Sequence, residues 1–277
     1  NQFLAHIREV DAVAYVVRCF EDDDITHVEN RIDPIADAET VETELMLADL
    51  DSLEKRRSTI EKKAKTGDKD AKAQVVLIDK ALALLREGKP ARLVALTPEE
   101  VAPFRLLQLL TAKPVLYVCN VDEGSAKAGN AHSRRVEERA KAEGAGCVAI
   151  SAKIEAEFAG LAPEEREAFL TDLGLEEPGL NRLIREGYNL LGLITYFTVG
   201  PKEARAWTVT AGTKAPQAAG VIHTDFEKGF IRAETIAYTD FVTLGGEVGA
   251  KDAGKMRLEG KEYVVRDGDV MHFRFAN

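Results

Sequence analysis

Residues 114–123 read PVLYVCNVDE, an apolar run that reaches Asn120 and continues into Val121, Asp122 and Glu123. Two further runs have the same character, AVAYVVRCF at 12–20 and GCVAIS at 146–151. Short, valine-rich runs without polar alternation are typical of strands buried on both faces, as in parallel sheets. The three runs therefore predict neighbouring strands of one parallel sheet.

Helical patterns separate these runs. We expect helices over 1–10, 98–109, 133–142 and 179–191. Strands that alternate with helices predict an α/β fold with helices on both faces of a parallel sheet, in which ligands bind at the carboxyl ends of the strands. Asn120 and Ser151 lie at two such ends. The loops after them are predicted to meet at one edge of the sheet, although on Asn120 to Glu123 alone a surface turn is the simpler interpretation.

Residues 39–90 interrupt the alternation with two long helical stretches around a turn, TGDKD, at 66–70. Steps of three and four residues connect Met46, Leu50, Leu53, Arg57, Ile60 and Ala64, and then Ala71, Val75, Ile78, Leu82 and Leu85. This spacing predicts an antiparallel, coiled-coil-like pair of helices. A helix over 39–64 would be about 39 Å long, so the pair should project as an arm. Arg57 is the one charged residue in its apolar seam.

The pattern changes again after Leu191, to short alternating strands with turns. It predicts a separate, small α+β domain, in which Asp267-Gly268 signals a hairpin turn. The predicted organisation is a first part of the α/β domain at 1–38, the helical arm at 39–90, the second part of the α/β domain at 91–191 and the small domain at 192–277.

Composition excludes several classes of protein. The chain has 277 residues, 45% of them hydrophobic, which is enough for a buried core. No apolar run approaches the roughly 20 residues of a membrane span, and a secretory leader is not recognisable. Cys19, Cys119 and Cys147 are far apart, so neither a zinc site nor a disulfide framework is indicated. A cytoplasmic, monomeric protein fits these features.

Charge is distributed unevenly, with a formal net charge of -10. Residues 39–90 and 192–277 each contain 11 basic and 11 acidic side chains. If RNA or a ribosome is a partner, these segments would contact its phosphates, because such contacts need local lysine and arginine. A solvated, mixed-charge surface is the simpler alternative. Nothing indicates a DNA partner.

The two strand-end loops resemble the base-recognition elements of P-loop GTPases, N-K-x-D followed by S-A-K. The matching residues are Asn120, Val121 and Glu123 in the first loop, and Ser151, Ala152 and Lys153 in the second. Five flanking segments extend the resemblance: NQFLAHIR at 1–8, VRCFEDDDITHV at 17–28, ELMLADLD at 44–51, GLEEPGLNRLIR at 174–185 and HTDFEKGFIRAE at 223–234. Together they are similar to the YchF/Obg-like ATPase family over essentially the whole chain.

The resemblance implies an Obg-type G domain interrupted by a helical arm and followed by a TGS domain of β-grasp fold. It also implies a ribosome-associated hydrolase that binds the large subunit or its RNA and uses ATP or GTP with Mg²⁺. Two alternatives remain open. One is a nucleotide-independent RNA- or ribosome-binding module formed by the arm and the TGS domain, and the other is a GTPase of translation.

Two substitutions in the Asn120 loop predict a preference for ATP. Val121 stands where the GTPase motif has lysine, and Glu123 where it has aspartate. An aspartate accepts hydrogen bonds from both the imino and the 2-amino group of guanine, and a glutamate places its carboxylate one methylene further out. Specificity that rests on such hydrogen bonds is lost when the acceptor is misplaced.

One departure from the family pattern concerns the phosphates. The sequence contains no G-x-x-x-x-G-K-S/T loop, so the backbone amides, the lysine and the Mg²⁺-holding hydroxyl of that loop are missing. Without them, the stabilisation of charge that phosphoryl transfer requires is also missing. We expect an N-terminally truncated chain that does not hydrolyse ATP and holds no metal by itself.

Further residues are candidates for catalysis and for contact with RNA. The resemblance places His27 where the family organises the attacking water, and Asp22, Asp23 and Asp24 would favour its charged form. Phe226 and Phe230 could stack on RNA, but core residues are the more usual role. The lysines that could reach phosphates are Lys62, Lys63, Lys65, Lys69 and Lys72 around the arm tip, and Lys228.

Overall fold

The computed structural model describes residues 2–22 and 31–276. The chain divides into two compact units, Asn1–Leu190 and Leu191–Asn277. The strands of the first unit are β1 (Val13–Arg18), β2 (Val115–Asn120) and β3 (Gly146–Ile150). Its α-helices are α1 (Gln2–Glu9), α2 (Pro34–Lys65), α3 (Lys69–Arg86), α4 (Pro98–Arg105), α5 (Ala131–Glu143), α6 (Ala152–Gly160), α7 (Pro163–Asp172) and α8 (Gly179–Leu191), with 3-10 turns η1 (Ala91–Leu93) and η2 (Glu123–Ser125).

The three strands form a parallel sheet in the order β1-β2-β3, which confirms the predicted parallel α/β arrangement. Side chains alternate between its faces. On one face, Tyr117 and Cys119 pack against residues of α2 and α5. On the other, Leu116 and Val118 pack against Leu183 of α8. Coverage of both faces explains why the strand sequences are apolar throughout.

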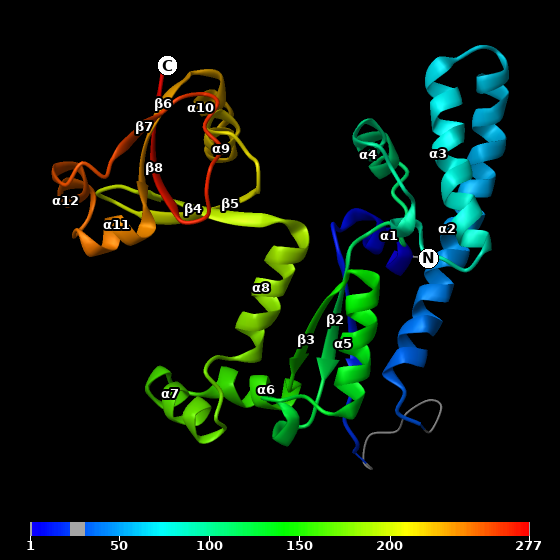
Figure 1. Cartoon of the computed structure of the whole chain (residues 1–277), viewed down its shortest axis with the longest axis horizontal. Coiled ribbons are helices and arrows are strands. Elements are labelled where there is room, and N and C mark those ends of the chain that lie inside the picture. Colours follow the sequence, from blue (N-terminus) through cyan, green and yellow to red (C-terminus); the bar gives the residue numbers. More distant parts are fainter. Residues whose placement is uncertain (1, 23–30, 277) are drawn as a thin grey trace. The chain divides into compact units, whose positions relative to one another are not determined.

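Helices α2 and α3 lie side by side as the antiparallel pair seen in Figure 1. Leu53, Ile78 and Leu82 are buried between them. Arg57, the charged residue of the seam, reaches Asp79 with two hydrogen bonds of 2.5 and 3.3 Å, so its charge is paired at the seam's edge. Helix α2 begins at Pro34, earlier than predicted, because Asp33 caps it and proline needs no N–H partner in the first turn.

The base of the arm is fixed by a buried carboxylate. Asp49 of α2 accepts hydrogen bonds from the Leu110 N–H, the Thr111 N–H and the Thr111 hydroxyl, each at 2.8 Å. Thr111 Oγ1 in turn accepts from the Ala91 N–H at 3.0 Å. These bonds join the arm to the segment that leads into β2, and hence to the strand that ends at Asn120.

One predicted helix of the first unit is wrong in its extent, and two helices were missed. The helix expected over 98–109 ends at Arg105, and Gln108 has a positive φ of 53°, which an α-helix cannot contain. The chain turns there and buries Leu107 and Leu109 in the core instead. Helices α6 and α7, after β3, were not predicted from the sequence.

The second unit contains a five-stranded mixed sheet. Its strands are β4 (Leu193–Val199), β5 (Ala204–Thr210), β6 (Phe230–Ala237), β7 (Arg257–Glu259) and β8 (Asp269–Phe275), in the order β5-β4-β8-β6-β7. Its helices are α9 (Ala215–Ile222), α10 (Thr224–Lys228), α11 (Tyr238–Thr243) and α12 (Glu247–Asp252). Helix α9 buries Ala215, Ala218 and Ala219 in the core of the unit, and the Tyr196 hydroxyl of β4 donates to the Ala218 carbonyl at 2.8 Å.

The hairpin predicted at Asp267-Gly268 is also wrong. Gly268 has φ of 81°, as a turn requires, but β8 pairs with β4 and β6 and not with the preceding strand β7. Asp267 Oδ1 accepts from the Thr195 N–H at 2.8 Å, and the Gly268 N–H donates to the Thr195 carbonyl at 2.8 Å. The turn therefore places β8 beside β4. Within the described ranges, no helix has the length and apolarity that crossing a membrane requires.

Candidate functional site at the strand ends

The carboxyl ends of the parallel strands meet at one edge of the sheet, and backbone hydrogen bonds continue past the strands. The Cys19 N–H donates to the Asn120 carbonyl at 2.8 Å, and the Val121 N–H donates to the Ile150 carbonyl at 2.8 Å. The loops that follow β2 and β3 are thus held side by side, as their positions in the sequence predict.

Asn120 joins these two loops directly. Its side-chain Oδ1 accepts a hydrogen bond from the Ala152 N–H at 2.9 Å. Ala152 is the first residue of α6, where a backbone N–H has no acceptor within its own helix. Asn120 therefore caps this helix from a neighbouring strand and braces the S-A-K loop.

Glu123 and Lys153 form an ion pair across the two loops. The side chains are 43% and 66% exposed, so the pair lies at the surface of the site. The hydrogen bond from Lys153 holds the pKa of Glu123 below its usual range, and the same bond raises the pKa of Lys153. Near neutral pH the Glu123 carboxylate is ionised and engaged by the ammonium group.

Asp122 has a different role from its neighbour. Its carboxylate accepts from the Ser125 N–H at 3.0 Å and from the Ser125 hydroxyl at 2.8 Å, and so it caps η2. The hydrogen bond from the Ser125 side chain lowers the pKa of Asp122. Both oxygens are used within the turn, which leaves Glu123 as the carboxylate that faces Lys153.

Val121 and Ser151 are buried, each with 2% of its surface exposed. The Val121 side chain belongs to the core beside β1 and β2, and its contribution to the site is the path of the backbone. Ser151 Oγ is buried and makes no hydrogen bond within the described part of the chain. A buried hydroxyl without a partner is uncommon in proteins, and this one lies at the end of β3, directly before the Ala152 N–H that Asn120 binds.

Asn130 is a site residue that the sequence did not single out. Its Oδ1 accepts from the Ser133 N–H at 3.0 Å and caps α5, while its Nδ2 donates to the Cys19 carbonyl at 2.6 Å. It thereby holds the end of β1 next to the Asn120 loop. The capping pattern of an asparagine followed three residues later by serine could have located it.

Glu155 of α6 was also not singled out. Its carboxylate accepts from the Gly179 N–H at 2.7 Å and from the Leu180 N–H at 3.2 Å, at the beginning of α8. It fixes α8 against α6, the helix that carries Lys153. The segment GLEEPGLNRLIR at 174–185 indicates where α8 begins, but it does not indicate which carboxylate binds the first N–H groups of that helix.

Three thiols lie near the site, Cys119 in β2, Cys147 in β3 and Cys19 directly after β1. Cys119 and Cys147 have their sulfur atoms 3.8 Å apart, and all three cysteines are free. The Cys147 hydrogen bond lowers the pKa of Cys119, but the bond with Cys19 and burial outweigh it and raise that pKa to about 12. The contact with Cys119 and burial raise the pKa of Cys147 as well.

The arm-tip lysines lie apart from the strand-end loops. All five are exposed, on the last turn of α2 and the first turns of α3: Lys62, Lys63, Lys65, Lys69 and Lys72. Lys65 is 3.2 Å from Glu61 in an ion pair. In the second unit, Lys228 is exposed at the end of α10.

The aromatic residues near Lys228 are core residues. Phe230 is 4% exposed, and Phe226 stacks on Phe275 with ring centroids 3.9 Å apart. His27 and its neighbours Asp23 and Asp24 lie outside the described residues. Among the residues that are described, no three histidine, cysteine, aspartate or glutamate side chains cluster closely enough to hold a metal ion.

Comparison with known proteins gives one consistent result. Residues 193–276 match the family YchF-GTPase_C, described as a protein of unknown function (DUF933). The chain is 58% identical to the Ribosome-binding ATPase YchF of Haemophilus ducreyi, over 99% of the chain and 76% of the relative, and 53% identical to that of Bacillus subtilis with the same coverage. The solved structure of the Schizosaccharomyces pombe YchF GTPase superposes with a TM-score of 0.87 at 37% identity, over 99% of this chain and 75% of that one. With this identity over nearly its entire length, the chain belongs to the YchF family.

Proposed function

We propose that the chain forms most of a nucleoside-triphosphate hydrolase that works on the ribosome, and that residues 120–123 and 151–153 hold the base of its nucleotide. Relatives with more than half of their aligned residues identical are named ribosome-binding ATPases. The observation that carries the base site is the 2.9 Å bond from the Ala152 N–H to Asn120 Oδ1, which holds the two loops together at the sheet edge.

We further propose that this site prefers ATP to GTP. Guanine would need a carboxylate free to accept from its imino and 2-amino groups. Here the carboxylate is Glu123, whose ion pair with Lys153 already occupies an oxygen. Adenine has no 2-amino group and loses nothing when that acceptor is engaged, so the ion pair disfavours guanine selectively.

Calorimetry tests base preference on a protein of the relatives' full length. The wild type should bind ATP more tightly than GTP, and Glu123→Asp should shift the ratio toward GTP, because the shorter side chain moves the carboxylate away from Lys153. Val121→Lys is unsuitable as a companion change, since Val121 is buried and the variant would place an ammonium group in the core. Clearly tighter GTP binding by the wild type would contradict the proposal and favour a GTPase of translation.

Hydrolysis is proposed to need more than these 277 residues, which contain no phosphate-binding loop. Mg²⁺ would then be held by the phosphates and by residues of that loop, and His27 would position the attacking water. Phosphate release by the 277-residue chain should stay at the background rate in the presence of ATP and Mg²⁺. Turnover that Asn120→Ala abolishes would overturn this part of the proposal.

The arm and the second unit are the proposed contacts with the ribosome. The tip lysines are exposed, and Lys62, Lys63, Lys69 and Lys72 make no ion pair with a described residue. Phosphate contacts by such side chains would be salt-dependent. For the second unit, the order β5-β4-β8-β6-β7 with α9 packed on the sheet supports the β-grasp assignment, with Lys228 as a candidate RNA contact.

Co-sedimentation with ribosomes distinguishes a ribosome-dependent hydrolase from a nucleotide-independent binding module. The exposed lysines are compatible with both functions. The triple variant Lys63→Glu, Lys65→Glu, Lys69→Glu should lose most of its binding at low salt. If ATP changes the binding of the full-length protein, the hydrolase proposal is supported. Binding that is equal with and without ATP favours the module, and binding that is insensitive to both the variant and salt removes the arm tip from the proposal.

A further inference from the structure

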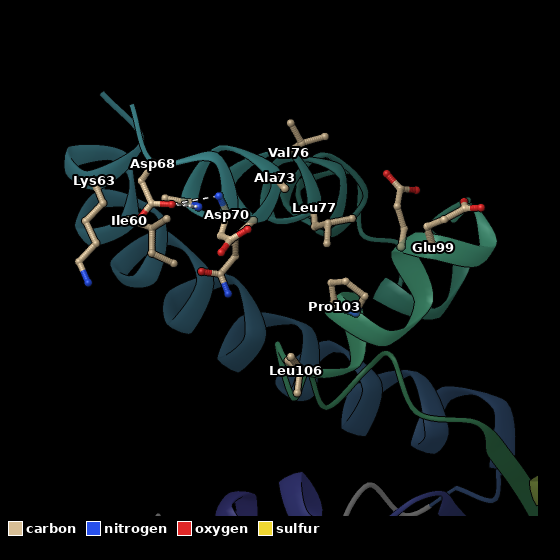
Figure 2. Close-up of a pocket in the computed structure, with 13 residues that line it drawn as sticks. Ile60, Lys63, Asp68, Asp70, Ala73, Val76, Leu77, Glu99, Pro103 and Leu106 are labelled. Carbon is tan, nitrogen blue, oxygen red and sulfur yellow. Dashed lines mark hydrogen bonds between the residues drawn. The ribbon is translucent and has the colours of Figure 1, made fainter. Parts of the chain in front are cut away.

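A groove on the arm has a chemistry different from that of the lysine tip. It lies between α2, α3 and α4, with a volume of about 640 Å³. In Figure 2, α4 lies beside the helical pair, and Leu77 of α3 is on the side of the pair that faces Pro103 and Glu99 of α4. The groove belongs entirely to the first unit.

The floor of the groove is apolar and partly uncovered. Ile60, Ala73, Leu77, Pro103 and Leu106 supply it from three different helical segments. Leu106 is 71% exposed, and Val76 at the border of the groove is 52% exposed. Large aliphatic side chains clustered at the surface around a hollow are typical of a protein-binding site.

Carboxylates surround this floor. Asp68, Asp70, Glu99 and Glu100 line the groove, against the single lysine Lys63. Lys80 neutralises Glu100 with bonds of 2.7 and 2.8 Å. Asp68 is occupied in capping α3, where it accepts from the Asp70 and Ala71 N–H groups at 3.0 Å.

The remaining acidic side chains of the groove are Asp70 and Glu99, of which Glu99 also accepts hydrogen bonds from the Thr97 side chain and from its own N–H. Neither forms an ion pair with any residue that the structure describes, and both are exposed. Their charges would repel the phosphates of RNA and attract a cation. These two carboxylates therefore favour a cationic partner, although the nearby tip of the arm carries lysines.

We propose that this groove binds a short amphipathic helix of a partner protein, with leucine-like side chains on the floor and lysine or arginine side chains next to Asp70 and Glu99. An amphipathic helix in a groove between helices is a common mode of peptide recognition, with anchors at i, i+3 or i+4, and i+7. An apolar floor bordered by unpaired carboxylates matches its apolar face and its flanking charges. The proposal is independent of nucleotide binding and hydrolysis.

The test uses the 277-residue chain and two helix-forming peptides that share one leucine face. One peptide carries lysine at the flanking positions and the other glutamate. Affinity is measured by fluorescence anisotropy, and the position of binding by the methyl NMR signals of Leu77 and Leu106. The lysine peptide should bind and shift these two signals, while the methyl signals of Leu47, which is 54% exposed on α2 outside the groove, should not move.

Two variants test the apolar floor and the carboxylates of the groove, and a third serves as the control. Leu106→Asp should weaken the lysine peptide about tenfold or more. Asp70→Lys with Glu99→Lys should weaken it by about tenfold, as expected for two exposed ion pairs, and should improve binding of the glutamate peptide. Leu47→Asp is the matched control and should leave both affinities within about twofold.

Several outcomes would overturn the proposal. Equal affinity for the two peptides would remove the charge selection, and absence of binding by both at millimolar concentration would remove the site. Displacement of the Leu106 signal by a single-stranded RNA of 12 nucleotides would identify an RNA surface. Self-association of the wild type that Leu106→Asp abolishes would identify a second copy of the chain as the occupant.

Discussion

Replacing Asp49 should separate the helical arm from the sheet energetically. The Asp49 side chain is fully buried, and it accepts three hydrogen bonds, from Leu110 and Thr111. Leu110 and Thr111 are 1% and 2% exposed, so their N–H groups are shielded from bulk water. Asp49→Ala would leave two backbone N–H groups buried without an acceptor.

The magnitude follows from these donors. An unsatisfied buried N–H costs about 1–3 kcal/mol, so two would cost about 4 kcal/mol. Part of this cost is offset, because the variant also removes a buried charge. Burial raises the pKa of Asp49, although the hydrogen bonds and the Arg8 charge 3.8 Å away lower it, so the buried charge itself is unfavourable. We expect Asp49→Ala to lower the free energy of unfolding by about 3 kcal/mol and Asp49→Asn, which keeps one acceptor oxygen, by about half as much.

The assay is urea unfolding followed by far-UV circular dichroism, with Glu44→Ala, an exposed change on the same helix, as the control. The single tryptophan, Trp207, lies in β5, so its fluorescence reports unfolding of the second unit separately. The reasoning is refuted if Asp49→Ala stays within about 0.5 kcal/mol of the wild type, the range of ordinary surface changes, or if Asp49→Asn costs more than Asp49→Ala.

Three further predictions concern the region around the site. Cys119, with a pKa of about 12, should remain unmodified by iodoacetamide at pH 8 in the folded protein and react after urea unfolding; rapid labelling of the folded protein would contradict this. Gly179→Ala should destabilise the first unit by about 1–2 kcal/mol, because the added methyl group would lie 2.8 Å from a carboxylate oxygen of Glu155 and 2.9 Å from a methyl group of Ile150. Gly187→Ala in the same helix has open space around it and should be neutral or stabilising in the same unfolding assay. Because the pKa of Glu123 is lowered, its ion pair contributes to stability above the ordinary carboxyl pKa and is lost as pH falls through the lower folded-state value. Lys153→Gln should therefore raise the titration midpoint of Glu123 measured by carboxyl NMR. An unchanged midpoint would show that the pair does not form in solution.

Part of the site could be predicted from residue order alone. Parallel strands bring their carboxyl ends to one edge, so apolar runs that end at Asn120 and Ser151 were sufficient to place the two loops together. The ion pair of Glu123 with Lys153 and the capping bond from Asn120 to Ala152 were beyond reach of the sequence, because each depends on the orientation of a side chain across two loops. Val121 illustrates the limit: its position in a loop motif suggested a ligand contact, and the structure buries it in the core.

The sequence by itself determined the features that rest on local periodicity: the parallel strands, the paired arm helices and the change of pattern near Leu191. Tertiary structure decided what depends on residues far apart in the chain. Asp49 is read from sequence as one more polar residue of a helix, and it becomes a buried anchor only because Leu110 and Thr111 are brought to it. Strand β8 similarly lies between β4 and β6 although a turn signal suggested a local hairpin. The physical reason is that periodicity specifies which face of an element is buried, whereas the partner of each polar group is specified by packing across the whole fold.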